Sequence, residues 1–323
     1  MAVYTHITLS ELASALAAFP LGNTEALQEV GDGIENTTYF FRATSVDGAV
    51  SEYVLTIIEN LPLVQVRYSA ELCIHLENAN LPVPAPVRNY NGDYLFSLAG
   101  KDALIFPRAK GRHPRHITAE HCRVIGDYLA HAHRQGMTFP GKLANSRGLG
   151  WLQRAADALA LRATRTDSTL LQEQLVRYKH LVSAAPSLSQ GAIHGDLFRD
   201  NTLFCGHRLS GVIDFYNACN DWLLMDVAIA LNDWCVVPGS AGCDDGLSGE
   251  FLAAYHRVRP FTAEERQCWQ EVLCIAATRF WVSRLLGHLA PELLGGEVKT
   301  KDPQPFKALL LHHRHGVPPL PGE

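Results

Sequence analysis

The alternation of apolar and polar positions over the first hundred residues predicts a small β-sheet with helices attached. Short β-type runs at residues 27–30, 38–43 and 53–58 are each bounded by glycine, aspartate or asparagine, as strands often are. Helical spacing occupies residues 8–19, which open with the capping box TLSE, and residues 63–78. The chain therefore begins as a mixed α and β unit.

The pattern changes after residue 80. Residues 81–86 contain three prolines and cannot be helical, since each proline also restricts the residue before it. They lead into residues 87–96, where an Asn-Gly pair predicts a hairpin with a type I′ turn. We expect the last strand of the first unit at residues 103–106.

Helices dominate the rest of the chain. The spacing is helical at residues 118–135 and again, after a segment of mixed character, to about residue 313. Residues 316–323 have the composition of a frayed tail. The pattern predicts an α+β protein with two lobes: a sheet-rich lobe at residues 1–106 and a larger, mainly helical lobe at residues 107–323.

Composition narrows the class of partner. The chain has 323 residues, 47% of them hydrophobic, and a net charge of −5 without any block of lysine or arginine. Such a charge gives a nucleic acid or an anionic membrane nothing to bind, so a small-molecule partner is expected. We also expect no export signal and no membrane span, because no apolar run is long and uninterrupted.

Cysteine and histidine spacing argues against a metal centre. The eight cysteines form no CxxC pair and follow no metal-ligand spacing, which predicts reduced thiols in a cytoplasmic protein. The histidine-rich residues 312–315 lack acidic or cysteine neighbours. We interpret them as a solvated helix end.

Residues 194–201, which read HGDLFRDN, carry the most specific chemistry in the chain. They are followed by Asp214 at the end of the apolar run 209–213. ATP-dependent phosphoryl transfer needs a carboxylate that orients the acceptor hydroxyl, and an amide oxygen and a second carboxylate that hold Mg²⁺. Asp196, Asn201 and Asp214 meet these needs. A histidine-containing turn alone would explain the HxD triplet, but not the asparagine and second aspartate at this spacing.

A glycine-rich turn precedes this segment. Residues 31–36, GDGIEN, lie between two β-type runs, and glycine lets backbone N–H groups come close to phosphate oxygens. Gly31, Gly33 and Asn36 are therefore candidate nucleotide contacts. A plain hairpin turn would look the same by itself; the position of this turn before the HxDxxxxN segment favours the phosphate-binding interpretation.

Taken together, these segments resemble the kinase-like phosphotransferases that include aminoglycoside phosphotransferases and choline kinases, and most of all the bacterial homoserine kinases. The resemblance is carried by residues 31–40, 53–56, 193–201, 211–216 and 218–234, and extends over nearly the whole chain. It implies a two-lobed protein kinase-like fold with ATP in the cleft. It also implies phosphorylation of L-homoserine in threonine synthesis.

The third strand departs from the general kinase pattern. Kinases carry a lysine there that contacts the phosphates, whereas this chain has Thr56. The resemblance leads us to expect this threonine in the homoserine kinase subgroup, and to place Thr56 and Phe106 at the nucleotide. Arg199 is the candidate replacement cation, with Lys101 and Arg42 less well placed. Alternatively, Arg199 is a surface residue that pairs with a neighbouring aspartate.

Two further residues of the motif region have expected structural roles. His194 is expected to hold the loop while Asp196 does the chemistry. Asp226 begins an apolar helical run and would cap it. In the kinase-like fold an acidic residue at this place also accepts the backbone N–H groups of the catalytic loop, and the two roles are compatible.

The charges of an amino-acid acceptor indicate which residues would bind it. An amino acid is a zwitterion, so its site needs an anion for the ammonium group and a fork of donors for the carboxylate. Asp221, Asp233 and Arg279 are the candidates, although surface or core roles would explain each of them equally well. Other acceptors remain open, such as choline, an aminoglycoside or methylthioribose. The sequence does not determine the oligomeric state. Because Thr56 stands in place of the lysine, a nucleotide-binding pseudokinase regulator also remains an alternative.

Overall fold

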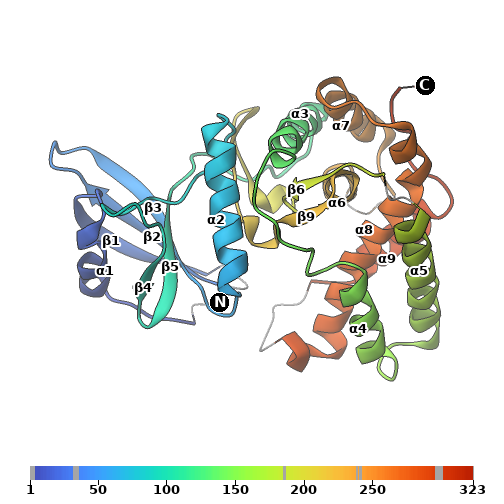
Figure 1. Cartoon of the computed structure of the whole chain (residues 1–323), viewed down its shortest axis with the longest axis horizontal. Helices are drawn as coiled ribbons and strands as arrows, with labels where there is room; N and C mark the ends of the chain where they lie inside the picture. Colours follow the sequence, from blue (N-terminus) through green and yellow to red (C-terminus); the bar gives the residue numbers. More distant parts are fainter. Residues whose placement is uncertain are drawn as a thin grey trace.

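The structure is a computed structural model that describes residues 4–31, 36–184, 187–237, 239, 242–294 and 301–322. It has a sheet-rich part formed by the first third of the chain and a larger helical part formed by the rest (Figure 1). The long helix α2 (Leu63–Asn78) lies between the two; the sequence predicted this helix at residues 63–78 but did not predict its place between the two parts.

The sheet-rich part is a five-stranded antiparallel sheet in the order β1-β2-β3-β5-β4. Alternation of side chains along β2 turns Tyr39, Phe41 and Ala43 inward. They pack against Leu12 of α1 in a core that also includes Ile105 of β5. The elements are α1 (Leu9–Ala15), β1 (Asn23–Val30), β2 (Thr37–Thr44), β3 (Val50–Ile57), β4 (Phe96–Leu98) and β5 (Lys101–Pro107).

Helix α2 (Leu63–Asn78) joins the two parts (Figure 1). One face, including Val66 and Ala70, packs with the sheet through Leu104. Another face, including Leu72 and Leu76, belongs to the core of the helical part. Because α2 contributes to both cores, it fixes how the sheet sits relative to the helices.

The helical part surrounds two small antiparallel β pairs. Strand β6 (Gln190–Ile193) pairs with β9 (Cys219–Trp222), and β7 (Thr202–Cys205) pairs with β8 (Arg208–Val212). Helix α6 is apolar on nearly every side and is buried at the centre, as a helix with that composition must be. The helices are α3 (Ala119–Gly136), α4 (Leu149–Leu159), α5 (Arg165–Ala184), α6 (Leu223–Trp234), α7 (Asp245–Val258), α8 (Ala263–Leu289) and α9 (Gln304–His313).

The predicted hairpin at residues 87–96 is wrong. The turn exists, with Gly92 at φ +89°, but residues 87–95 form no strand. The side chain of Asn89 instead accepts the backbone N–H groups of Asn91 and Asp93, both at 2.9 Å. A backbone bond from the Asn89 N–H to the Asp93 carbonyl at 2.8 Å closes the same turn, but no strand ladder continues from it.

The predicted solvated end is also wrong in part. His313 is fully buried, and its Nε2 lies 2.7 Å from Oδ1 of Asn232 on α6. The tail packs as well, since the Trp269 indole donates to the Pro318 carbonyl at 2.8 Å and Leu320 is buried. Tertiary contacts with α6 and α8 order both segments, although their composition is that of an exposed end.

Helix α8 meets the length and apolarity expected of a membrane span, and in the described part of the chain it alone does so. However, 72% of its most apolar stretch is buried inside the protein. Such burial is typical of a core helix, which satisfies the same criteria. All eight cysteines are free, as predicted.

Candidate active site

The loop that carries the HGD triplet begins where strand β6 ends. Gly195 has φ +75°, and a Cβ atom at this position would lie 2.6 Å from the carbonyl oxygen of Asn217. Both the left-handed backbone and the close approach therefore require glycine. The turn brings Asp196 next to the segment that follows β8.

His194 holds this loop as a neutral imidazole. Its Nε2 lies 3.0 Å from the carbonyl of Ile213, which can only accept, so Nε2 carries the proton. Its Nδ1 then accepts the backbone N–H of Asp196 at 3.2 Å. Burial lowers the pKa of His194, which keeps the ring neutral. The expected structural role of this residue agrees with these contacts.

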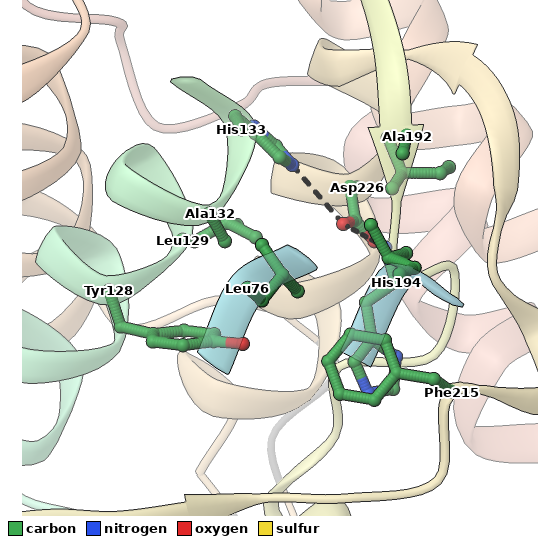
Figure 2. Close-up of a pocket in the computed structure, with 11 residues that line it drawn as sticks. Leu76, Tyr128, Leu129, Ala132, His133, Ala192, His194, Phe215 and Asp226 are labelled. Carbon is green, nitrogen blue, oxygen red and sulfur yellow. Dashed lines mark hydrogen bonds and ion pairs between the residues drawn. The ribbon is translucent and has the colours of Figure 1, made fainter. Parts of the chain in front are cut away.

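Asp226 braces the loop from α6. Its side chain is fully buried and accepts the backbone N–H groups of His194 and Gly195, both at 2.8 Å, and Nε2–H of His133 at 3.2 Å (Figure 2). Burial would raise its pKa, but these hydrogen bonds bring the pKa below its usual value. The predicted bracing contact is present. The predicted capping is wrong, because α6 begins at Leu223 and Asp226 lies inside its first turn.

A chain of buried polar groups continues behind Asp226. Nδ1 of His133 accepts from the Tyr255 hydroxyl at 2.7 Å, and Arg259 donates to the same hydroxyl at 3.2 Å. Arg259 also pairs with buried Glu265 at 2.6 Å. Sequence reasoning missed this network, because its members lie on three helices and no local spacing connects them. It anchors the catalytic loop to the junction of α7 and α8.

Asp196 and Asn201 contact each other within the loop. The Asn201 amide nitrogen donates to the Asp196 carbonyl at 2.8 Å and lies 3.3 Å from its carboxylate. Burial raises the pKa of Asp196, and the charge of Asp214 raises it further. A carboxylate with a raised pKa is a better proton acceptor than an ordinary aspartate.

Asp214 lies directly after the β7–β8 hairpin, on the exposed side of the loop. Its backbone is left-handed, at φ 64° and ψ 59°, which an aspartate adopts at some energetic cost. In the described residues no cluster of three or more His, Cys, Asp or Glu could hold a metal. The hard oxygens of Asp214 and Asn201 nevertheless suit Mg²⁺, which usually takes one or two protein oxygens and completes its shell from phosphates and water.

Comparison with known proteins identifies this arrangement. The sequence profile of the phosphotransferase enzyme family matches residues 26–265. The chain belongs to this family. Two relatives are homoserine kinases: one from Pseudomonas aeruginosa (strain UCBPP-PA14), 38% identical over 98% of this chain and 97% of its own length, and one from Cupriavidus necator, 37% identical over 99% and 98%. This phosphotransferase therefore belongs among the homoserine kinases by sequence.

Solved structures share the fold. An amicoumacin kinase in complex with AMP-PNP, Ca²⁺ and amicoumacin has a TM-score of 0.67 at 16% identity, covering 94% of this chain and 91% of its own. Spectinomycin phosphotransferase with ADP and spectinomycin has a TM-score of 0.66 at 11% identity, covering 96% and 98%. The phosphotransferase thus has the predicted two-lobed, protein kinase-like α+β fold.

The predicted nucleotide residues lie at one end of the sheet. Gly31 is an exposed turn residue directly after β1, and Gly33 falls outside the described residues. Asn36 is buried, and its side-chain oxygen accepts the backbone N–H of Glu59 at 3.2 Å. That contact ties the end of the glycine-rich turn to the residue that follows β3.

Thr56 is buried on β3, at the position where the general kinase pattern has a lysine. The hydroxyl of Tyr216, two residues after Asp214, lies beside it. Tyr216 and Phe106 are both partly buried against the cluster between the sheet and α2. Ser69 of α2 donates to the neighbouring Phe215 carbonyl at 3.0 Å, so α2 holds the segment that follows Asp214. Sequence reasoning did not single out Tyr216 for this place.

The two weaker candidate cations have other surroundings. Lys101 forms an ion pair with Glu59, whose side chain is only 4% exposed. Glu59 also accepts from the hydroxyls of Thr5 at 2.8 Å and Thr37 at 2.6 Å. Burial would raise the pKa of Glu59, but these partners lower it. Arg42 is exposed on β2.

Arg199 is bound to Asp233. The Asp233 carboxylate accepts the backbone N–H of Arg199 at 2.8 Å and its Nε at 3.1 Å. The predicted alternative pairing with Asp200 is not found, since Asp200 pairs with Lys301 at 2.9 Å. The roles of Arg199 at the phosphates and of Asp233 at the acceptor stay predictions. The structure adds that the two side chains form an ion pair, in which each balances the charge of the other.

Proposed function

We propose that this protein transfers the γ-phosphoryl group of ATP to the side-chain hydroxyl of L-homoserine, which yields O-phospho-L-homoserine and ADP. The observation that carries the proposal is the position of Asp196 between Asn201 and Asp214 on a loop braced by Asp226. The homoserine kinases that are 37–38% identical over nearly full length support this acceptor. The product is an intermediate of threonine synthesis, and the free cysteines suit a cytoplasmic enzyme.

Asp196 is the base in this proposal. Its carboxylate takes the proton of the acceptor hydroxyl while the hydroxyl oxygen forms a bond to the γ-phosphorus. The bond from that phosphorus to the β,γ-bridging oxygen breaks, and the electron pair leaves with ADP. The raised pKa of Asp196 favours this proton transfer, and the N–H bonds that Asp226 accepts keep the loop in place.

Asn201 and Asp214 would hold Mg²⁺, which neutralises phosphate charge when it is bound. The amide nitrogen of Asn201 faces Asp196, which leaves its oxygen for the metal. The negative charge of Asp214 raises the pKa of Asp196 in the structure, so a cation at this place would offset a repulsion that is already present.

The nucleotide is proposed to lie between the sheet and the helical part, that is, between residues 1–106 and residues 107–323. Gly31 and Gly33 would cover the phosphates, and Asn36, Thr56 and Phe106 would line the sheet side of the site. Support comes from the placement of Thr56 beside Tyr216, which lies two residues after the proposed metal ligand Asp214.

An acceptor screen tests the proposal. ADP release by the purified protein is measured with L-homoserine, L-serine, choline, methylthioribose and kanamycin, and without any acceptor. We expect L-homoserine to give the highest kcat/KM by a wide margin. A higher kcat/KM with another acceptor would show that this alcohol, and not L-homoserine, is the preferred substrate. Binding of ATP without turnover of any acceptor would instead favour the pseudokinase alternative.

A further inference from the structure

A pocket beside the catalytic loop lies between α4, α5 and α8. Its polar and aromatic lining comes from Asn145, Arg147, Trp151, Tyr178 and Arg279. The pocket thus brings two guanidinium groups together. The cavity shown in Figure 2 differs, because it is lined mainly by apolar side chains around His133 and Asp226.

Arg279 is the most informative residue of this pocket. Its side chain is only 7% exposed, and its Nη1 has no hydrogen-bond partner among the residues that the structure describes. Leaving a buried charged donor unpaired is costly, because the group has lost its water. The charge of Arg279 is partly balanced by the Asp221 carboxylate, whose pKa burial raises and Arg279 lowers, but the Nη1 donor itself is left for a ligand that accepts a hydrogen bond.

The position of Arg279 relates the pocket to the chemistry. Its Nη1 lies 3.8 Å from the place that a Cβ atom on Gly195 would take, directly before Asp196. An anion bound at Arg279 is therefore about one residue's length from the proposed base.

A chain of hydrogen bonds positions the second guanidinium. The Asp221 carboxylate on β9 accepts from the Asn145 amide at 2.5 Å, and the Asn145 oxygen accepts the backbone N–H of Arg147 at 2.7 Å. The Arg147 guanidinium then lies over the Trp151 ring, 5.3 Å from its centroid. The Asp221 carboxylate thus holds the loop before α4 through Asn145, and this loop places Arg147 at the pocket.

We propose that this pocket is the subsite for the α-carboxylate of the acceptor, with Arg279 and Arg147 as its donors and Asn145 as a positioning residue. The inference rests on the proposed function, which makes the acceptor an amino acid. The hydroxyl oxygen and carboxylate carbon of extended homoserine are about 5 Å apart, given bond lengths of about 1.5 Å. Two guanidinium groups suit a carboxylate, which accepts in a fork.

The subsite should discriminate between acids and neutral analogues. L-Homoserine amide keeps the hydroxyl and the ammonium group of L-homoserine but carries no negative charge. We expect wild-type kcat/KM to be about 10²-fold higher for the acid than for the amide, because the amide lacks the negative charge and the second acceptor oxygen that the buried Arg279 guanidinium would bind. The KM for ATP should be the same with both acceptors.

The test combines these two acceptors with variants of the pocket. Arg279→Met should lower kcat/KM for L-homoserine by about 10²-fold while leaving that for the amide nearly unchanged, so that the preference disappears. Arg147→Met, which removes a half-buried side chain, should reduce the preference with less risk to folding. Arg177→Met is the matched control: this arginine joins the same helices α5 and α8 through Glu271 at 2.9 Å, and it should keep the full preference.

The outcomes separate the subsite from the proposed function. Equal losses for acid and amide in the Arg279 and Arg147 variants would mean that these arginines only support the fold, and would overturn the subsite while homoserine kinase activity stands. If these variants raised the KM for ATP and left the KM for L-homoserine unchanged, the pocket would belong to the nucleotide, and the proposed carboxylate subsite would be overturned too. Wild-type protein that leaves L-homoserine unphosphorylated would overturn the proposed function and, with it, the ligand of the pocket.

Discussion

Replacement of Asp226 by asparagine tests whether the catalytic loop depends on one buried carboxylate. The wild-type side chain accepts three hydrogen bonds, from the backbone of His194 and Gly195 and from the ring of His133. Asparagine has the same size but only one acceptor oxygen, so its NH₂ group must face a donor. A buried donor left unpaired costs about 1–3 kcal/mol, and the lost charge weakens the remaining bonds.

We therefore expect Asp226→Asn to lower the free energy of unfolding by about 2–4 kcal/mol, a large share of the 5–15 kcal/mol that is usual for a folded protein. Urea unfolding followed by circular dichroism measures this loss. Asp127→Asn is the control, because Asp127 on α3 pairs with Arg257 of α7 at 3.5 Å on the exposed surface instead of in the interior. It should cost less than about 0.5 kcal/mol. Equal stability of the two variants would refute the bracing role.

The pH dependence gives a second check. The pKa of Asp226 is below its usual value in the folded state, so its stabilising effect is complete above the unfolded pKa and is lost as pH falls through the folded pKa. The stability difference between wild type and Asp226→Asn should thus be constant from neutral pH to about pH 5. It should shrink only below about pH 4. A difference that already declines at pH 6 would assign the effect to a neighbouring histidine.

Three other predictions concern the site and its surroundings. Arg199→Met should lower kcat/KM for ATP by about 2–4 kcal/mol of transition-state stabilisation if Arg199 contacts phosphate, whereas Asp233→Asn should keep most of the kcat/KM for ATP; equal losses of kcat/KM for ATP would show that the pair is structural. Asp214→Ala should abolish Mg²⁺-dependent ATP binding in calorimetry, and unchanged affinity would exclude Asp214 as a ligand. Burial lowers the pKa of His313 to about 3, so its neutral form stabilises the fold above the unfolded pKa and that stability declines as pH falls below about 6.5. Between pH 7 and 5 this loss is about 2 kcal/mol, and it should be absent in His313→Asn by urea titration.

The elements that sequence predicted well are those with strong local signals. The capping box of α1, the helical spacing of α2 and the short β-type runs of β2 and β3 all depend on neighbouring residues, and the structure has each element close to its expected bounds. The HGDLFRDN segment belongs to the same class, because its spacing alone places Asp196 and Asn201 in one loop.

What sequence missed depends on contacts between distant segments. His133 and Tyr255 are ordinary helix residues by pattern, and only the packing of α3 against α6 and α7 brings them into the network behind Asp226. Asn145 and Arg147 lie in a loop, and their link to Asp221 spans 76 residues of chain. At residues 87–96 the Asn-Gly pair does form a turn, but the Asn89 side chain accepts the N–H groups of Asn91 and Asp93, and residues 87–95 form no strand.

Direct detection of product in paired reactions tests the central proposal most directly. Wild-type protein and Asp196→Asn are incubated with Mg·ATP and L-homoserine, and phosphorus NMR measures ADP and O-phospho-L-homoserine. We expect equal amounts of both products from the wild type, and a rate lower by about 10² or more in the variant with little change in ATP affinity, because asparagine keeps the size but cannot take the proton. ADP without phosphohomoserine from the wild type, or a variant as fast as the wild type, would contradict the proposal.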